Sequence, residues 1–180
     1  RDRVLVLTYN TVTGEMDCDK QLCRGTPLVE ITARVRPYLT RLRVMGSVVF
    51  DALSLVDCPM LRKIYLSDCT VKNSSLLAIG TLTSVKIVDC RLDDKYILSS
   101  FISCCAELKK LCIYNSGLEG IISPDIERLR HLTCLNLAYN KLEGTVPSLD
   151  SLEELHLHNN RLSISREEQS DLKSKIPYTV

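Results

Sequence analysis

The sequence predicts an α/β solenoid, a curved coil with a parallel β-sheet on its concave side and helices, 3-10 turns and loops on its convex side. Three observations predict it: an apolar motif recurs along the chain, its copies start at nearly constant intervals, and asparagine or cysteine recurs at one fixed place within it. In each copy, two inner apolar positions alternate with other residues, which is the pattern of a short strand with one buried face. The 180 residues, of which 45% are hydrophobic, are enough to bury such a core.

The motif is clearest in the segment LTCLNLAYNKL, which begins at Leu132. Six copies fit the pattern L-x-x-L-x-L-x-x-N/C-x-L, with serine at the ninth place in two of them. Successive copies start 22, 21, 26, 24 and 20 residues apart. A unit of this length buries its apolar face only by stacking on its neighbours, so we expect one continuous core. The other five copies begin at Leu39, Leu61, Leu82, Leu108 and Leu152.

This motif and its period resemble those of the leucine-rich repeat (LRR) protein superfamily. The resemblance is strong over residues 39–162 and weak over residues 1–38, where residues 5–12 match the second half of one further copy. Cysteine at the ninth place in the middle copies resembles cysteine-containing, ribonuclease-inhibitor-like repeats. Leu142, Gly144 and Pro147 resemble instead the type with L-x-G-x-(I/V)-P after the motif. The resemblance implies an array of about seven to eight repeats of mixed type.

The ninth place of the motif follows the strand, where the chain turns and leaves backbone groups buried without a strand partner. Buried polar groups must be hydrogen-bonded, and an inward side-chain amide can both donate to and accept from that backbone. A cysteine can replace the amide as a small buried residue with a weak donor, so these cysteines are expected to be structural and unreactive. The predicted structural ladder consists of Asn10, Cys69, Cys90, Asn140 and Asn160.

Two segments before the regular repeats are predicted to depart from the motif. Residues 13–25 contain turn formers and charges without a period, which indicates an inserted loop. A convex helix is then expected to begin after the N-cap Thr26, with Pro27 at its first position, and to end before Pro37.

Two further convex segments are predicted within the regular repeats. Residues 50–60 also fit the motif, but they start only 11 residues after Leu39, which is too short for a coil. We interpret them as the outer segment of the Leu39 repeat. A second convex helix is expected over residues 93–105, where apolar residues have helical spacing.

The predicted domain organisation is a single LRR domain over residues 1–180, as part of a longer protein. Residues 1–38 are its irregular first repeat, with the inserted loop at 13–25, and residues 39–162 are the regular repeats. Residues 163–180 contain the polar, helix-compatible stretch SREEQSDLKSK, and terminal repeats need a polar cover. They are therefore expected to be a C-terminal cap or a truncated repeat.

The concave face is predicted by the same alternation, because residues beside the two inner apolar positions point away from the core. Five basic residues follow one another over the first four repeats, and strands about 4.8 Å apart would make them a nearly continuous stripe. Arginine and tyrosine are typical binding anchors. The alternative interpretation is that these charges only solvate an exposed sheet. The predicted partner-binding residues are Arg41, Arg43, Lys63, Tyr65, Lys86, Lys110, Tyr114, Asn136, Tyr139, His156 and His158.

The LRR resemblance implies protein–protein interaction, and the basic stripe favours a partner with an acidic surface or peptide. The chain is therefore predicted to be a scaffold, an adaptor or a regulatory subunit that binds its partner on the concave face. Two alternatives stay open: an extracellular ligand-binding LRR ectodomain, and a nucleic-acid-binding protein that uses the stripe. The net charge of +1 gives no general attraction to nucleic acid, and Asp68 and Asp89 interrupt a pure phosphate-binding track.

Catalysis, cofactors and metals are not predicted. Cys112 and His156 lie in one row of the predicted sheet, but two strand spacings, about 9.6 Å, would separate them. A nucleophile needs its base at hydrogen-bond distance. Glu154, His156 and His158 alternate along one strand and would hold zinc only if a further ligand such as Cys134 approached.

The cysteine content bears on the cellular compartment. The chain has nine cysteines, an odd number, without the paired C-x-x-C spacing of a zinc site. Many unpaired thiols favour a reducing compartment, so we expect an intracellular and cytoplasmic protein, with an extracellular location as the alternative. No apolar run approaches the ~20 residues that a membrane-spanning helix needs.

Overall fold

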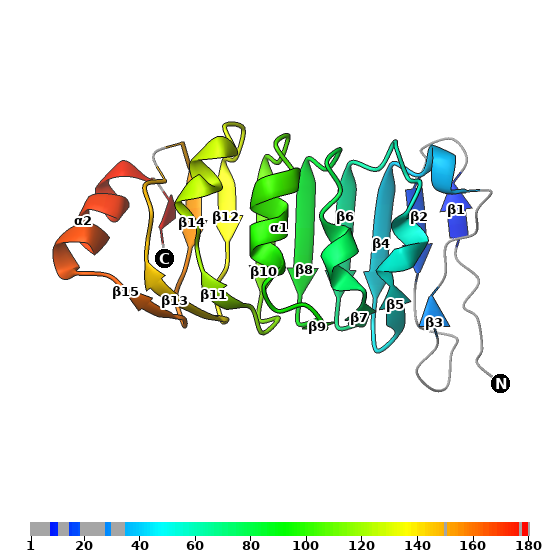
Figure 1. Ribbon diagram of the computed structural model, residues 1–180, viewed down its shortest axis with the longest axis horizontal. Coiled ribbons are helices and arrows are strands. Elements are labelled where there is room, and N and C mark those ends of the chain that lie inside the picture. The colour runs from blue at the N-terminus through cyan, green and yellow to red at the C-terminus, as the bar shows by residue number, and fades with distance from the viewer. Residues whose placement is uncertain are drawn as a thin grey trace.

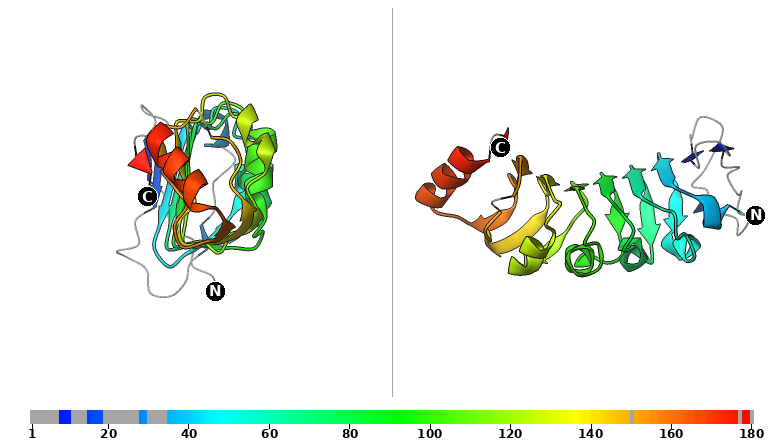
Figure 2. Two further views of the ribbon diagram at one scale, coloured as in Figure 1. Left: turned by 90° about the vertical axis from the view of Figure 1, so that its left-hand side faces the viewer. Right: turned by 90° about the horizontal axis from the view of Figure 1, so that it is seen from above.

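The computed structural model describes residues 8–10, 15–18, 28–29, 35–149, 151–176 and 178–179. The chain forms a curved coil in which one long sheet lies along the concave side and helices lie along the convex side (Figures 1 and 2). The right panel of Figure 2 shows the strands on the inner side of the curve and the helical segments on the outer side. This arrangement is the predicted α/β LRR solenoid.

The concave sheet has nine strands in the order β1-β2-β4-β6-β8-β10-β12-β14-β16. Neighbouring strands pair in parallel, except β1, which is antiparallel to β2. Parallel pairing follows from the repeat, because each coil returns the chain to the same face in the same direction. The strands are β1 (Thr8–Asn10), β2 (Glu15–Cys18), β4 (Arg41–Met45), β6 (Lys63–Ser67), β8 (Ser84–Val88), β10 (Lys110–Tyr114), β12 (Cys134–Asn136), β14 (Glu154–His156) and β16 (Tyr178–Thr179).

Two smaller parallel sheets lie where the chain leaves the concave side. One has four strands and belongs to the N-terminal half: β3 (Leu28–Val29), β5 (Val49–Asp51), β7 (Thr70–Lys72) and β9 (Arg91–Leu92). The other has three strands and belongs to the C-terminal half: β11 (Glu119–Ile121), β13 (Lys141–Thr145) and β15 (Arg161–Ser163).

The convex side consists mostly of single 3-10 turns. The interval of 26 residues between the copies that begin at Leu82 and Leu108 is the longest of the five, and it carries the α-helix α1. The shorter repeats before it have room only for a 3-10 turn. The helical segments are η2 (Arg36–Tyr38), η3 (Ala52–Leu55), η4 (Ser74–Leu77), α1 (Ile97–Cys104), η5 (Pro124–Arg128) and the terminal helix α2 (Arg166–Lys175).

The core runs through the coil as stacked rows of apolar side chains. The first inner position of the motif is 0–2% exposed in every regular repeat, which shows that the predicted inward residues are buried. Stacking of this kind removes each side chain from water on both sides and provides most of the stability of a repeat. The row consists of Leu42, Ile64, Val85, Leu111, Leu135 and Leu155.

The convex segments within the regular repeats agree with the predictions. Residues 97–104 form α1, and four of its apolar side chains are buried on the inner face, including Phe101 at 0% exposure. Residues 50–60 lie in the Leu39 repeat, where they end β5 and form η3. Within the described residues, no helix is both long enough and apolar enough to cross a membrane.

The N-terminal predictions need correction. Residues 15–18, expected to lie in an inserted loop, form β2 and pair with β4. Leu28 and Val29, expected to be helical, form β3 because they pair with β5. Pro37 lies inside η2 rather than beyond a helix, at a first-turn position that needs no N–H donor. Residues 1–7, 11–14, 19–27 and 30–34 lie outside the described residues, and with them the rest of these predictions.

At the C-terminal end, residues 166–175 form the expected polar helix and residues 178–179 form the strand β16. A capping box begins α2: the Glu168 amide donates to Ser165 Oγ at 3.1 Å, and the Ser165 amide donates to Glu168 Oε2 at 2.7 Å. The hydrogen bond from the Ser165 backbone lowers the pKa of the Glu168 carboxyl. These paired bonds fix the point at which the helix begins.

Candidate interaction surface on the concave face

The outward residues of the concave sheet lie in rows that cross the strands. The register of pairing brings the predicted concave residues side by side, so the columns expected from the sequence are neighbours in space. From β4 to β14, one row is Arg41, Lys63, Ser84, Lys110, Cys134 and Glu154. The next row is Arg43, Tyr65, Lys86, Cys112, Asn136 and His156.

Tyr65 lies between two cations in the second row. Arg43 Cζ lies 5.6 Å from the centre of its ring, and Lys86 Nζ lies 5.2 Å from it. At these distances a ring attracts a cation, which keeps both charges on the sheet surface. Lys63, Lys86 and Lys110, which we call the lysine cluster, are exposed, and none of them forms an ion pair with a carboxylate of the described residues.

The N-terminal end of the basic stripe meets an acidic strand. Pairing of β2 with β4 places Glu15 beside Arg41 and Asp17 beside Arg43. The sequence analysis did not predict either acidic residue as a neighbour of the stripe. The signal was present, because Met16 alternates with them at the position that pairs with Leu42.

The column after the strands has a special backbone. In all six regular repeats its residue has a positive φ, between 44° and 93°. Glycine, asparagine and aspartate tolerate this left-handed conformation best. The structure therefore explains Asp68 and Asp89, which the sequence analysis considered only as charges. Tyr139 differs from the other five residues of this column, which are glycine, aspartate or asparagine. The column is Gly46, Asp68, Asp89, Asn115, Tyr139 and Asn159.

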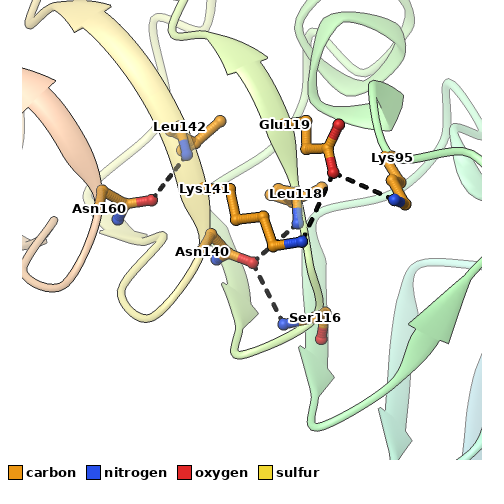
Figure 3. A network of polar contacts seen from close by, with 8 residues as sticks. All are labelled: Lys95, Ser116, Leu118, Glu119, Asn140, Lys141, Leu142 and Asn160. Atoms are coloured by element: carbon orange, nitrogen blue, oxygen red, sulfur yellow. Dashed lines mark hydrogen bonds and ion pairs between the residues drawn. The ribbon is translucent and has the colours of Figure 1, made fainter.

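Asn140 follows that column and supports the surface from inside. Its Oδ1 accepts hydrogen bonds from the amides of Ser116 and Leu118 at 3.2 and 3.0 Å (Figure 3). Its Nδ2 donates to three backbone carbonyls, among them Ile113 at 2.6 Å. Asn160 repeats the pattern one coil later, where its Oδ1 accepts from the Leu142 amide at 3.0 Å. Each asparagine thus connects its own turn to the turn of the preceding repeat.

The cysteine part of the ladder lies in the middle repeats. Cys69 and Cys90 are 2% and 4% exposed, and their Sγ atoms lie 3.5 Å apart. Contact with Cys90 and burial raise the pKa of the Cys69 thiol, so this group stays protonated. Ser116 continues the ladder, because its Oγ accepts from the Cys90 amide at 3.2 Å. Asn10, the remaining residue of the predicted ladder, lies in β1, which pairs antiparallel with β2 rather than in parallel. The side chain of Asn10 lies outside those described.

The C-terminal half of the face is aromatic rather than basic. The ring centres of Tyr114 and Tyr139 lie 5.1 Å apart, and those of Tyr139 and His158 also lie 5.1 Å apart. Glu154 Oε1 lies 2.9 Å from His156 Nε2. Hydrogen bonds from His156 and Cys134 lower the pKa of the Glu154 carboxyl. We call Tyr114, Tyr139 and His158 the aromatic cluster.

Family models for the leucine-rich repeat match residues 128–145 and residues 151–173 of the chain. Both matches fall on repeats whose strands, ladder residues and buried leucines are described above. The chain carries leucine-rich repeats. Among solved structures, it is similar to the plant peptide hormone receptor RGFR1 in complex with RGF2, with 18% sequence identity and a TM-score of 0.49. The match covers 76% of this chain and 31% of the receptor chain.

The structure places the reactive side chains considered from the sequence on β10, β12 and β14 and in the turn after β14. Within the described residues, no three His, Cys, Asp or Glu side chains are placed to hold a metal ion. His156 faces Glu154, whereas His158 packs on Tyr139. Burial raises the pKa of the Cys112 thiol, and burial together with the Glu154 hydrogen bond raises that of Cys134 to about 11. These thiols are therefore poor nucleophiles near neutral pH.

Proposed function

We propose that this LRR protein is a scaffold, adaptor or regulatory subunit that binds a partner protein on its concave face. LRR domains generally mediate protein–protein interaction, and a curved array presents an extended concave surface for it. The lysine cluster carries the proposal, because three exposed cations lie on the adjacent strands β6, β8 and β10, whose inward side chains are buried in the core. A rigid surface loses little conformational entropy when it binds.

The partner is proposed to present an extended acidic segment. Lys63 and Lys110 occupy one row with Ser84 between them, so about 9.6 Å separates their strands. Three residues of an extended chain span about 10 Å. A segment that crosses the strands can therefore place a carboxylate near each lysine at every third residue, with Lys86 in the neighbouring row between them. Such complementarity favours fast association and excludes basic partners.

A pair of charge-reversal variants tests this surface. The first carries Lys63→Glu and Lys86→Glu on the concave strands β6 and β8. The matched control carries Lys72→Glu and Arg91→Glu, which lie in the same two repeats on β7 and β9. All four residues are exposed, and both variants change the net charge equally. Each variant and the wild type are used as bait in nuclease-treated lysate of the source cells, and the retained proteins are identified by mass spectrometry.

We expect the wild type and the control to retain the same protein and the concave variant to lose it. Retention that is equal with all three baits would contradict the concave site. A protein that is retained from untreated lysate but not from nuclease-treated lysate would assign the stripe to nucleic acid instead. Circular dichroism establishes beforehand that both variants keep the fold of the wild type.

We also propose that the protein works in a reducing compartment. All seven cysteines whose side chains are described are free thiols, including the neighbouring pair Cys69 and Cys90. Titration of the denatured protein, isolated from its source under alkylating conditions, should find nine thiols. Several protected pairs would indicate an oxidising compartment and favour the ectodomain alternative.

A further inference from the structure

Tyr139 adopts a backbone conformation that tyrosine rarely adopts. Its φ is 58°, and the equivalent residues of the other regular repeats are glycine, aspartate or asparagine. The Tyr139 amide donates to the His158 carbonyl at 3.0 Å, so the next repeat holds the strained turn in place. A bulky residue in this conformation is an outlier, and such strain is concentrated at functional sites. The fold would be served better by asparagine, which occupies the place in the repeats on either side.

The ring of Tyr139 is not part of the core. The residue is 45% exposed, whereas the apolar positions of the same repeat, such as Leu135 and Leu137, are fully buried. Its ring leans on Tyr114 at an interplanar angle of 54° and meets His158 edge-on at 85°. Rings from three consecutive repeats therefore form one angled, partly exposed surface. Burial of its ring in the core cannot explain why a tyrosine stands at this strained position.

The aromatic cluster continues the lysine cluster along the same face. Strand β10 carries Lys110 at its start and Tyr114 at its end. Four strand residues span about 13 Å, so a ligand that crosses the lysines reaches the aromatic rings within four further residues. The neighbouring lysines repel a positively charged ligand side chain from the rings. An apolar side chain is not repelled, and aromatic rings that meet at an angle gain packing energy beyond their buried area.

We propose that Tyr114, Tyr139 and His158 form an anchor site for an aromatic side chain of the acidic partner segment. This inference rests on the proposed function and adds the second recognition element of the partner. The lysine cluster binds the acidic part of the segment, and the aromatic cluster fixes its register and direction, because only one end carries the ring. Anchors of this kind dominate affinity at protein interfaces.

Two labelled peptides and fluorescence anisotropy test the anchor. Both have eight residues with glutamate at the first and fourth positions and serine elsewhere, and one has phenylalanine at the eighth position. We expect the phenylalanine peptide to bind the wild type about tenfold more tightly than the all-serine peptide, the usual size of one aromatic anchor. Tyr139→Asn should abolish that gain while melting no lower than the wild type, because asparagine accepts the left-handed backbone.

The matched control is Tyr96→Asn, which removes a tyrosine that is 59% exposed and lies beside α1. It should keep the tenfold gain. A second variant, His158→Ser, removes one ring without changing a residue of positive φ. In this variant the affinity gain from phenylalanine should fall about threefold, because one smaller contact is lost. The anchor is refuted if phenylalanine adds nothing or if Tyr139→Asn keeps the gain. Failure of both peptides to bind, or binding unaffected by Lys63→Glu with Lys86→Glu, would instead overturn the proposed function.

Discussion

At the scale of single residues, Asn140 takes the place of hydrogen-bond partners that the turning backbone lacks. It is 8% exposed and bonds to backbone groups of its own repeat and of the preceding one. The amides of Ser116 and Leu118 lie in the turn and donate to Asn140 Oδ1 in place of a strand carbonyl. The Asn140 side chain therefore holds the turn of its own repeat against the turn of the preceding repeat.

The first prediction concerns this side chain. Asn140→Ala should lower the free energy of unfolding by about 2–4 kcal/mol, because buried amides and carbonyls lose their partners. Asn160→Ala should have a smaller effect, since Asn160 is less buried than Asn140. Urea denaturation followed by circular dichroism measures both. A loss below about 0.5 kcal/mol for Asn140→Ala would show that water replaces the amide.

The sequence predicted where residues lie better than it predicted what they do. The alternation of the motif was enough to place Lys63, Tyr65 and Lys86 on one face, because a strand has a side-chain period of two. The strain at Tyr139 could not be predicted, because it depends on a φ angle that the motif does not encode. The rings of Tyr139 and His158 likewise meet only through the turns after β12 and β14.

At the scale of elements, polar side chains connect consecutive coils at the edge where the convex turns begin. Asp51 Oδ1 accepts from Asn73 Nδ2 at 2.9 Å, and Asp93 Oδ2 accepts from the Asn73 amide at 2.6 Å. Asp93 Oδ1 also accepts from the Ser74 amide and hydroxyl at 2.8 and 2.6 Å. These bonds hold η4 against the repeats on both sides. Burial opposes the charge of Asp93, but the bonds from Ser74 and Asn73 outweigh it and lower the pKa of this carboxyl.

The second prediction concerns Asp93→Asn, which should lower the free energy of unfolding by about 1 kcal/mol at pH 7. Because the folded pKa is depressed, the charged carboxylate contributes its stability above the unfolded pKa of about 3.9 and loses it as pH falls further. The difference between variant and wild type should therefore shrink below about pH 4. Chemical denaturation at pH 7, 5 and 3 measures it, with the exposed Glu107→Gln as control. A difference that does not change with pH would exclude the charge as its cause.

The elements that the sequence analysis missed lie where the repeat is weakest. Strand β2 carries Met16 and Cys18 opposite Leu42 and Val44, but polar residues surround this short alternation. The helix-start signals at Thr26 and Pro27 predicted a helix at residues 28–29, and pairing with β5 overrides them. The regular repeats were predictable because the same apolar spacing recurs six times, and no single local signal had to carry the prediction.

At the scale of the whole molecule, each repeat packs mainly on its two neighbours. We propose that α2 is a cap over the repeat that begins at Leu152. Leu172 on α2 packs against the core and, with Leu155 and Leu162, lines a cavity of about 200 Å³ under the helix. The remaining surface of α2 is polar and exposed, as the outer face of a cap must be.

The third prediction is that Leu172→Glu loosens only the repeat that α2 covers. A charge under the cap should raise amide hydrogen exchange over residues 152–162, while β6 and β8 exchange as in the wild type, because stability in a repeat array is a sum of local terms. Mass spectrometry of peptic fragments resolves the two regions. Ser170→Glu adds the same charge to the exposed surface of α2 and should change neither region. Uniformly faster exchange along the chain would show that the array unfolds as a single unit.

The separation of inward and outward residues on each strand has a consequence for how such a surface can be redesigned. Ser84, Cys112 and Asn136 take no part in the row of buried leucines, so each can be exchanged while the neighbouring core residue stays in place. Changes on alternate strands lie about 9.6 Å apart and should combine additively, whereas changes on adjacent strands should couple. New binding specificities could therefore be assembled one repeat at a time, with every second strand varied independently.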